Sequence, residues 1–239
     1  MSVKTRLHES LHRVGLDVVP YSGRYFPARR RAEILHVLGV DLVLDVGANE
    51  GQFGRELRRE GYRGRITSFE PLGEAFERLI RAADGGWDVH RVALGAEPGS
   101  AILHRSRNSW SSSLLPITSR HLDASPDASY VGTEEVAVRT LDSFELDGRL
   151  YLKIDAQGSE PAVLEGARVT IERAVVALEL ELSTAALYED QALVGDVLTD
   201  LHGRGFAVLS LTPGLRHPRT REILQLDGIF AKQTVLAEA

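Results

Sequence analysis

The stretch DLVLDVGANEGQF, residues 41–53, decides the expected fold of this chain. Its first part is aliphatic except for Asp45, as is typical of a strand buried on both faces of a parallel sheet. Gly47 and Gly51 then bracket a tight turn, and Asn49 is the residue between them that best tolerates a positive φ. After the turn the pattern becomes helical, so a ligand can approach the backbone directly at the turn.

Three classes of ligand use a strand, a glycine turn and a helix in this order. A phosphate-binding P-loop ends in Gly-Lys-Ser/Thr, and no lysine stands in this turn. A dinucleotide turn has its second glycine where the pyrophosphate meets the backbone, and that position is Asn49. The turn therefore predicts a cofactor without a pyrophosphate. S-adenosylmethionine is such a cofactor, and D-x-G-x-N-x-G resembles the first motif of the class I methyltransferases.

A second apolar strand ends at Glu70, and Pro71 stops it. Glu70 stands at roughly the distance from the glycine turn at which an acid accepts hydrogen bonds from ribose hydroxyls. The alternative is a solvated acid at a strand end. Ala93 and Leu94, at the end of the third predicted strand, would lie at an adenine edge if that strand end faces the same cleft.

At 239 residues the chain is long enough for one α/β domain with a complete core. We predict an N-terminal helical cap over residues 1–40 and a cofactor-binding domain over residues 41–239. The lack of cysteine excludes disulfides, cysteine zinc sites and a thiol nucleophile. A formal charge of −6 argues against a nucleic-acid partner. No apolar run has the length of a signal-peptide core or a membrane span, which predicts a cytoplasmic protein.

Helical spacing of apolar residues predicts helices over residues 1–19 and 27–39. The loop between them carries Tyr21, Tyr25 and Phe26. These aromatic side chains either line the mouth of the cleft or hold the N-terminal helices on the core.

The remaining chain alternates strands with helices and closes in a hairpin, which predicts a Rossmann-like α/β fold, a seven-stranded sheet with helices on both faces. Residues 105–135 interrupt this pattern and are rich in Ser, Asn and Pro. We expect residues 108–113, with Ser112, to cover the cleft and offer hydroxyls to cofactor or substrate, and residues 119–129 to be exposed; the alternative is a mobile surface insertion. Strands are predicted at residues 66–69, 87–94, 101–104, 136–140, 150–155, 175–182, 206–211 and 223–231, and further helices at residues 74–83 and 194–201.

Methyl transfer from a sulfonium is an in-line displacement, so the protein must align the acceptor and remove its proton. Asp155, at the carboxyl tip of a predicted strand, is the best candidate for this step. It would act as a general base or as a ligand to a divalent cation that lowers the pKa of the hydroxyl. In the second case Glu179 and Glu181, two residues apart on one strand face, would complete a Mg²⁺ site with Asp155. The alternative is that both are ordinary strand-end acids.

Glu160 and His104 are further catalytic candidates. Glu160 stands in the first turn of a predicted helix, where the helix dipole alone would favour an acid. His104 and His121 lie beside or in the predicted cleft loop. Either could act as a base, and the alternative is that they are surface histidines. Lys153, in a strand, is expected to form a salt bridge below the site rather than to act in catalysis.

Five separated motifs, LDVGANEGQF, ITSFEP, SWSSSLL, RTLDSF and YLKIDAQGSEPAVLEGA, together resemble the FkbM family of methyltransferases. The resemblance runs from about Asp41 to Phe230. It implies a class I fold and S-adenosylmethionine-dependent O-methylation of a hydroxyl on a sugar, a glycolipid or a polyketide-type natural product. Ser159 stands where the family often has a bulkier side chain. Asp45, Gly47, Asn49, Gly51, Gln52, Phe53, Glu70 and Pro71 match its cofactor motifs, and Asp155, Gln157, Gly158 and Glu160 match its strand-four motif.

The sequence thus predicts a cytoplasmic O-methyltransferase with a small-molecule or glycolipid hydroxyl acceptor, possible Mg²⁺ dependence and a possible homo-oligomer. Three alternatives stay open. They are a non-catalytic protein that keeps the cofactor fold, a methyltransferase with a different small-molecule acceptor, and a nicotinamide oxidoreductase. The absence of an N/D-P-P-Y motif makes a nucleic-acid or amide N-methyltransferase a less favoured fourth.

Overall fold

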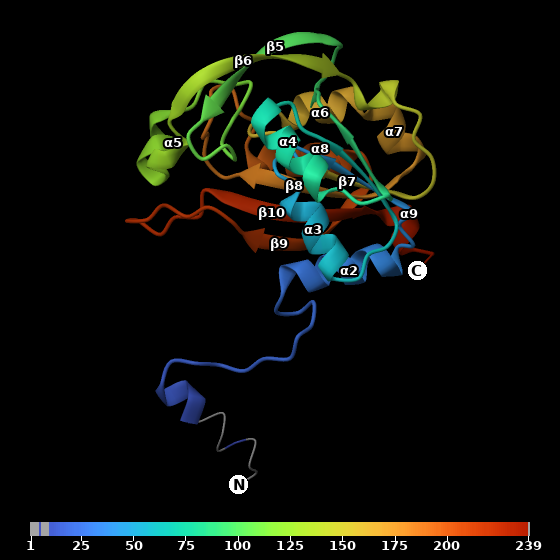
Figure 1. The fold of residues 1–239 in the computed structure, drawn as a ribbon. Coiled ribbons are helices and arrows are strands. Elements are labelled where there is room, and N and C mark those ends of the chain that lie inside the picture. Colours follow the sequence, from blue (N-terminus) through green and yellow to red (C-terminus); the bar gives the residue numbers. More distant parts are fainter. Residues whose placement is uncertain (1–4, 6–9, 239) are drawn as a thin grey trace.

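The computed structural model describes residue 5 and residues 10–238. A seven-stranded sheet forms its centre, with the strand order β3-β2-β1-β7-β8-β10-β9 (Figure 1). Neighbouring strands are parallel except at β10, which is antiparallel to both β8 and β9. The predicted α/β fold is therefore confirmed. The strands are β1 (Leu42–Val46), β2 (Arg65–Phe69), β3 (Trp87–His90), β7 (Leu150–Ile154), β8 (Val175–Ser183), β9 (Phe206–Pro213) and β10 (Gln225–Lys232).

Helices cover both faces of this sheet. The sequence of β7 is almost continuously apolar because both of its faces are buried. Leu152 packs into the core on one face and Tyr151 into the core on the other. The Tyr151 face is covered by α2 (Pro27–Val37), α3 (Gln52–Arg59) and α4 (Gly73–Ala82), and the Leu152 face by α6 (Glu160–Gly166), α7 (Arg168–Arg173) and α8 (Val194–Gly203).

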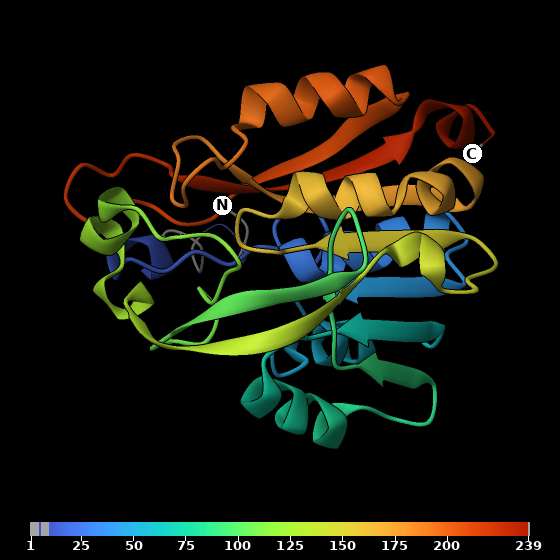
Figure 2. The same ribbon diagram turned by 90° about the horizontal axis from the view of Figure 1, so that it is seen from above.

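A second, three-stranded sheet has the order β4-β6-β5. Its strands are β4 (Ala93–Leu94), β5 (Gly99–Ser106) and β6 (Tyr130–Arg139). The long β5–β6 pair crosses over the main sheet (Figure 2) and packs Leu103 and Val136 against the start of α4. The remaining short helices are α5 (Ser119–Ala124), α9 (Gln233–Leu236), and the 3₁₀ turns η1 (Pro126–Ala128) and η2 (Leu141–Ser143).

The second sheet corrects two predictions. The expected strand over residues 87–94 is two strands, because the chain turns after His90 and β4 leaves the main sheet to pair with β6. The expected loop over residues 105–135 contains α5 and the first half of β6. The first prediction was wrong because the apolar pattern continues across the turn after His90. The second was wrong because a polar composition concealed a strand whose pairing partner is distant along the chain.

The N-terminal part follows the prediction only over α2. Of the helix expected over residues 1–19, residues 1–4 and 6–9 lie outside the described residues, residues 10–13 are helical, and residues 16–20 are not. The latter extend away from the sheet in Figure 1. The division at residue 40 stays a prediction. Within residues 10–238 and residue 5, no helix has the length and hydropathy needed to cross a bilayer.

Candidate active site

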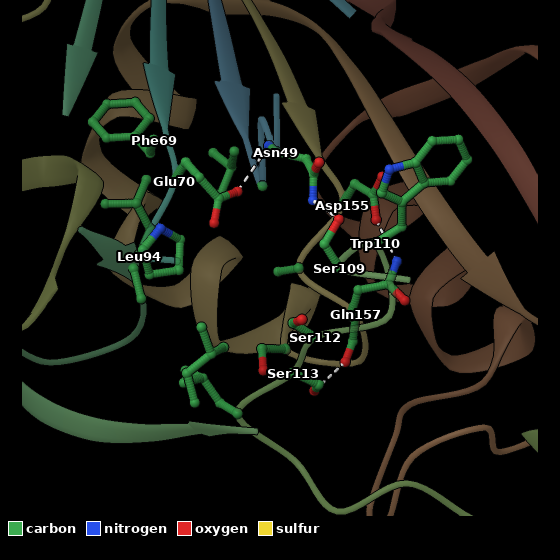
Figure 3. Close-up of a pocket in the computed structure, with 18 of the residues that line it drawn as sticks. Asn49, Phe69, Glu70, Leu94, Ser109, Trp110, Ser112, Ser113, Asp155 and Gln157 are labelled. Atoms are coloured by element: carbon green, nitrogen blue, oxygen red, sulfur yellow. Dashed lines mark hydrogen bonds between the residues drawn. The ribbon is translucent and has the colours of Figure 1, made fainter. Parts of the chain in front are cut away.

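A pocket opens at the carboxyl ends of β1, β2 and β7, where Gly47, Glu70 and Asp155 face one space (Figure 3). Parallel strands place their carboxyl ends at one edge of a sheet, and ligands of such sheets bind there. The pocket is lined by Val46, Gly47, Asn49, Gln52, Phe69, Glu70, Pro71, Val92, Ala93, Leu94, Leu103, Ser109, Trp110, Ser112, Ser113, Leu114, Asp155, Ala156, Gln157 and Ser159.

The turn after β1 has the backbone that the sequence predicted. Gly47 has a φ of 73°, and a Cβ on it would lie 1.9 Å from the carbonyl oxygen of Asp155. Asn49 has a φ of 47°, and its Oδ1 accepts a hydrogen bond from the Glu50 N–H. Only glycine allows the β1 turn to lie directly against the tip of β7, which is how the two halves of the pocket come together.

Glu70 ends β2 inside the pocket and is held by the backbone. Its Oε2 accepts the N–H of Asn49 at 2.7 Å, and its Oε1 accepts the N–H of Leu72 at 2.7 Å. Burial raises the pKa of Glu70 to about 7, although both N–H groups favour the ionised form. Each carboxylate oxygen has a second lone pair, so the group can also accept hydrogen bonds from a vicinal diol such as a ribose.

One side of the pocket is apolar and the other is polar. The apolar side combines Phe69 of the main sheet with side chains of the second sheet and the loop beside it. An apolar lining of this kind suits a heteroaromatic ring such as adenine next to Glu70. The sequence predicted Ala93 and Leu94 here but not Val92, Leu103 and Leu114, because the approach of these three side chains depends on the second sheet.

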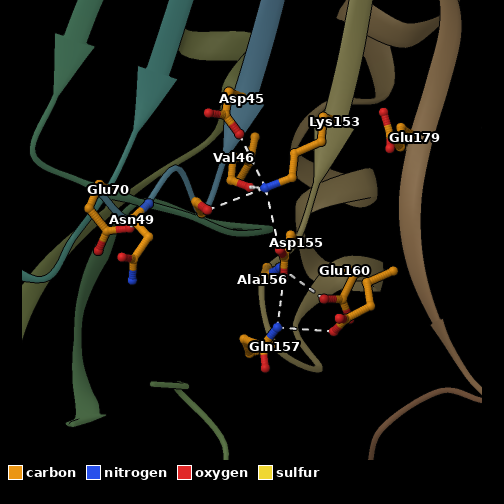
Figure 4. Close-up of polar contacts among 12 residues, drawn as sticks. Asp45, Val46, Asn49, Glu70, Lys153, Asp155, Ala156, Gln157, Glu160 and Glu179 are labelled. Carbon is orange, nitrogen blue, oxygen red and sulfur yellow. Dashed lines mark hydrogen bonds and ion pairs between the residues drawn. The ribbon is translucent and has the colours of Figure 1, made fainter. Parts of the chain in front are cut away.

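The polar side is organised by Lys153, which lies below the pocket (Figure 4). Its Nζ is 3.2 Å from Asp45 Oδ1 and 3.4 Å from Asp155 Oδ2, and it is also within reach of the carbonyl oxygens of Val46 and Gly47. Burial opposes the Lys153 charge, but the two carboxylates raise its pKa above the usual range. Lys153 therefore stays charged and holds the β1 and β7 tips together, and it forms the salt bridge that the sequence predicted.

Gln157 connects Asp155 to the rest of the polar side. Its Nε2 donates to Asp155 Oδ1 at 2.6 Å and to Glu181 Oε2 at 3.0 Å, and its Oε1 accepts the hydroxyl of Tyr188 at 2.7 Å. These partners fix the orientation of the amide, and the amide fixes one oxygen of Asp155. The strand-four motif contained Gln157, but only the fold reveals Tyr188 as its partner.

The segment 109–113 closes the pocket opposite the strand tips. Asn49 Nδ2 donates to Ser109 Oγ at 3.3 Å, and Ser113 Oγ donates to the Gln157 carbonyl oxygen at 2.6 Å. The Tyr188 hydroxyl also lies 3.2 Å from the Ser111 carbonyl oxygen. The cleft loop is thus hydrogen-bonded to both halves of the pocket, and Ser112 lies in its lining.

Several predicted site residues lie outside this lining. Asp45 is buried beneath the pocket and pairs with Lys153, and Gly51 precedes α3. Phe53 lies under the pocket, where its ring contacts Lys153 and Arg31. These three residues support the cofactor turn from below.

The structure also places Glu160 and His104 away from the pocket. Glu160 accepts the N–H groups of Ala156 and Gly158, so it holds the turn that carries Gln157, and burial raises its pKa to about 7. The His104 ring stacks on Tyr130, with 4.9 Å between ring centroids. His121 is buried against Tyr188 instead of being exposed. Tyr21, Tyr25 and Phe26 lie outside the lining as well.

The carboxylates proposed for Mg²⁺ do not form a metal site. Glu179 forms an ion pair with Arg31 and accepts the Tyr151 hydroxyl at 2.6 Å, whereas Asp155 and Glu181 are bridged by the Gln157 amide. Over the part of the chain that the structure describes, no group of three acids or histidines is placed to hold a metal ion. Glu179 and Glu181 do share a sheet face, as their spacing in the sequence predicted. That spacing could not reveal that Arg31, far away in the sequence, already neutralises Glu179.

Comparison with known proteins agrees with this geometry. The family model for the methyltransferase FkbM domain matches residues 45–208. Among solved structures, a methyltransferase FkbM from Methylobacillus flagellatus is 18% identical with a TM-score of 0.51, over 79% of this chain and 43% of that chain. This chain thus spans less than half of that protein. A putative RNA methyltransferase from Pyrococcus horikoshii is 12% identical with a TM-score of 0.45, over 86% of this chain and 84% of that chain. No curated protein sequence gives a significant match.

Proposed function

Because the chain belongs to the FkbM family of methyltransferases, we propose that it methylates a hydroxyl group of a sugar, a glycolipid or a polyketide-type natural product, with S-adenosylmethionine as the methyl donor. The observation that carries this proposal is the convergence of Gly47, Glu70 and Asp155 on one pocket. A diol-binding acid, an apolar wall and a strand-tip carboxylate are the parts that such a reaction needs.

The residues present fit an adenosyl group with a charged amino-acid tail. Glu70, which accepts the N–H groups of Asn49 and Leu72, would also accept the ribose hydroxyls, and the apolar wall of Phe69 and Leu94 would hold the adenine. The turn at Gly47 and Asn49 leaves the backbone open to the amino-acid part. Bound there, the cofactor supplies a methyl group on a positively charged sulfur, an electrophile that needs no further activation.

Asp155 is the residue that we propose to act on the acceptor. Its side chain is 35% exposed, and it is held by Lys153 and Gln157 at the edge of the pocket. With the cofactor bound, Asp155 would accept the proton of the acceptor hydroxyl while that oxygen takes the methyl group that the cofactor supplies. The products are the methyl ether and S-adenosylhomocysteine, and the proton passes from Asp155 to water.

A transfer assay tests this function. The purified chain is incubated with methyl-labelled S-adenosylmethionine and a panel of glycosides, glycolipids and polyketide alcohols, with amines, phenols and RNA as comparison acceptors. We expect label in a hydroxyl acceptor and an equal amount of S-adenosylhomocysteine.

Other outcomes identify the alternatives. Cofactor binding in calorimetry without turnover on any acceptor would favour a non-catalytic protein. Transfer confined to amines, phenols or RNA would refute the acceptor class, and binding of a nicotinamide dinucleotide in place of S-adenosylmethionine would refute the cofactor.

A further inference from the structure

Trp110 lies in the lining of the pocket while 67% of its surface is exposed. The other tryptophan, Trp87, is 5% exposed and donates its indole N–H to Ser68. An indole is one of the largest apolar side chains, and burying it is strongly favourable. Because the indole belongs to the pocket lining, a ligand that enters the pocket can cover it.

The exposure does not come from a loose loop. The Asn108 side chain accepts hydrogen bonds from the Ser106 hydroxyl and the Ser111 N–H, and its Nδ2 donates to Ser111 Oγ. Ser109 has a φ of 58°, a conformation that a non-glycine residue adopts at a cost. Together with the bond from Asn49 to Ser109, these contacts fix the backbone on both sides of the indole.

The position of Trp110 separates it from the adenosine side. In the view of Figure 3, Trp110 lies on the same side of the pocket as Asp155, and Phe69 and Leu94 lie on the other. The lining on the Trp110 side is otherwise polar. The labelled lining residues near it are Asn49, Ser109, Asp155 and Gln157.

We propose that Trp110 is the platform on which a pyranose ring of the acceptor stacks, with the hydroxyl to be methylated directed at Asp155. A pyranose has one face of C–H bonds, which packs on the electron-rich face of an indole, and hydroxyls around its edge. One apolar surface beside several polar groups matches that chemistry. A flat aromatic acceptor would need a second apolar wall beside the indole, and the neighbouring residues Asn49, Asp155 and Gln157 are polar. This inference rests on the proposed function and narrows its acceptor class.

Fluorescence tests the contact without requiring turnover. Acrylamide quenches an exposed tryptophan, and Trp110 is far more exposed than Trp87. With S-adenosylhomocysteine present, we expect octyl and methyl glycosides of hexoses and 6-deoxyhexoses to reduce the quenching of the wild type several-fold. Trp110→Phe, which leaves only Trp87, should show low quenching and no response to glycosides.

Two outcomes would overturn the proposal. If S-adenosylhomocysteine alone protects Trp110, the indole contacts the cofactor instead. If no glycoside of the panel protects it at millimolar concentration, the acceptor side does not bind a pyranose. Protection without methyl transfer would instead contradict the proposed function and leave the platform in place.

Kinetics provide the second readout. With a glycoside acceptor, we expect Trp110→Ala to raise the acceptor KM at least tenfold, with little change in the affinity for S-adenosylhomocysteine, and Trp110→Phe to restore most of the loss. Tyr25→Ala removes a 46% exposed aromatic side chain outside the pocket and is the matched control. An unchanged acceptor KM in Trp110→Ala would refute the platform.

Discussion

Two groups of charged side chains lie on the same face of the main sheet, and only one of them opens to the pocket. The inner group consists of Arg31, Tyr151 and Glu179, and the tip group consists of Lys153, Asp155 and Gln157. The ring of Phe53 lies between them, 4.8 Å from the Arg31 guanidinium and 5.5 Å from the Lys153 ammonium. Each group pairs a cation with a carboxylate, yet their surroundings differ.

In the inner group the charges satisfy one another. Glu179 receives two hydrogen bonds from Arg31 and one from Tyr151, and the side chains of Glu179 and Arg31 are 7% and 11% exposed. In the tip group Asp155 receives one hydrogen bond from Gln157 and remains one-third exposed beside the pocket. The same residue types therefore stabilise the fold where they are enclosed, and they are available to a ligand where a strand ends at the pocket.

The largest expected effect is on catalysis in the tip group. Asp155→Asn keeps an oxygen that accepts from Gln157 but removes the negative charge, so the proton acceptor is lost. We expect kcat to fall by about 10²–10⁴-fold, the usual contribution of a general base, with unchanged affinity for S-adenosylhomocysteine by calorimetry. A kcat within a few-fold of the wild type would assign Asp155 to the supporting structure.

The matched change in the inner group is Glu179→Gln. It leaves the buried Arg31 without its main carboxylate partner, although Glu56 still lies 2.6 Å away. We expect the free energy of unfolding to fall by about 3 kcal/mol, as measured for broken buried ion pairs, while kcat of the folded protein is retained. Urea denaturation followed by tryptophan fluorescence measures the first quantity. A large loss of kcat with normal stability would show that the inner group takes part in the reaction.

The smallest expected effect concerns the cofactor and its pH dependence. The carboxylate of Glu70 accepts ribose hydroxyls in its ionised form, and burial raises its pKa to about 7. The affinity for S-adenosylhomocysteine should therefore increase as the pH rises through about 7. Glu70→Gln should weaken binding by about 10- to 100-fold at pH 8, since a hydrogen bond to a charged group contributes about 1.5–3 kcal/mol, and should remove most of this pH dependence.

The raised pKa of Glu70 also makes the stability of the protein depend on pH, in the direction opposite to the affinity for S-adenosylhomocysteine. The pKa of Glu70 is higher in the folded protein than its usual value of 4.5, so the folded state binds more protons between these values. The free energy of unfolding of the unliganded wild type should then decrease as the pH rises from about 5 to 7. Glu70→Gln should flatten this slope, and Glu160, with a pKa also raised to about 7, should maintain part of it. An equal slope in Glu70→Gln would contradict the shift.

The sequence predicted that the β1 turn and Glu70 lie at one pocket. Gly47, Asn49 and Glu70 belong to short segments whose backbone is determined by neighbouring residues, so their positions follow from the pattern. The acceptor half was predicted less well. The partner of Gln157 lies 31 residues away at Tyr188, and Trp110 reaches the pocket on a loop between two strands of the second sheet.

Local patterns in the sequence are enough to predict the fold class, the glycine turn and the acids that follow β2 and β7, because strand and turn preferences act over a few residues. Which of the predicted acids is open to a ligand depends on the packing of distant segments. Arg31 lies 148 residues before Glu179 and neutralises it, whereas Asp155 ends its strand beside an open pocket. Pairing of charges over such a separation depends on how α2 packs on the sheet, and no local pattern encodes that packing.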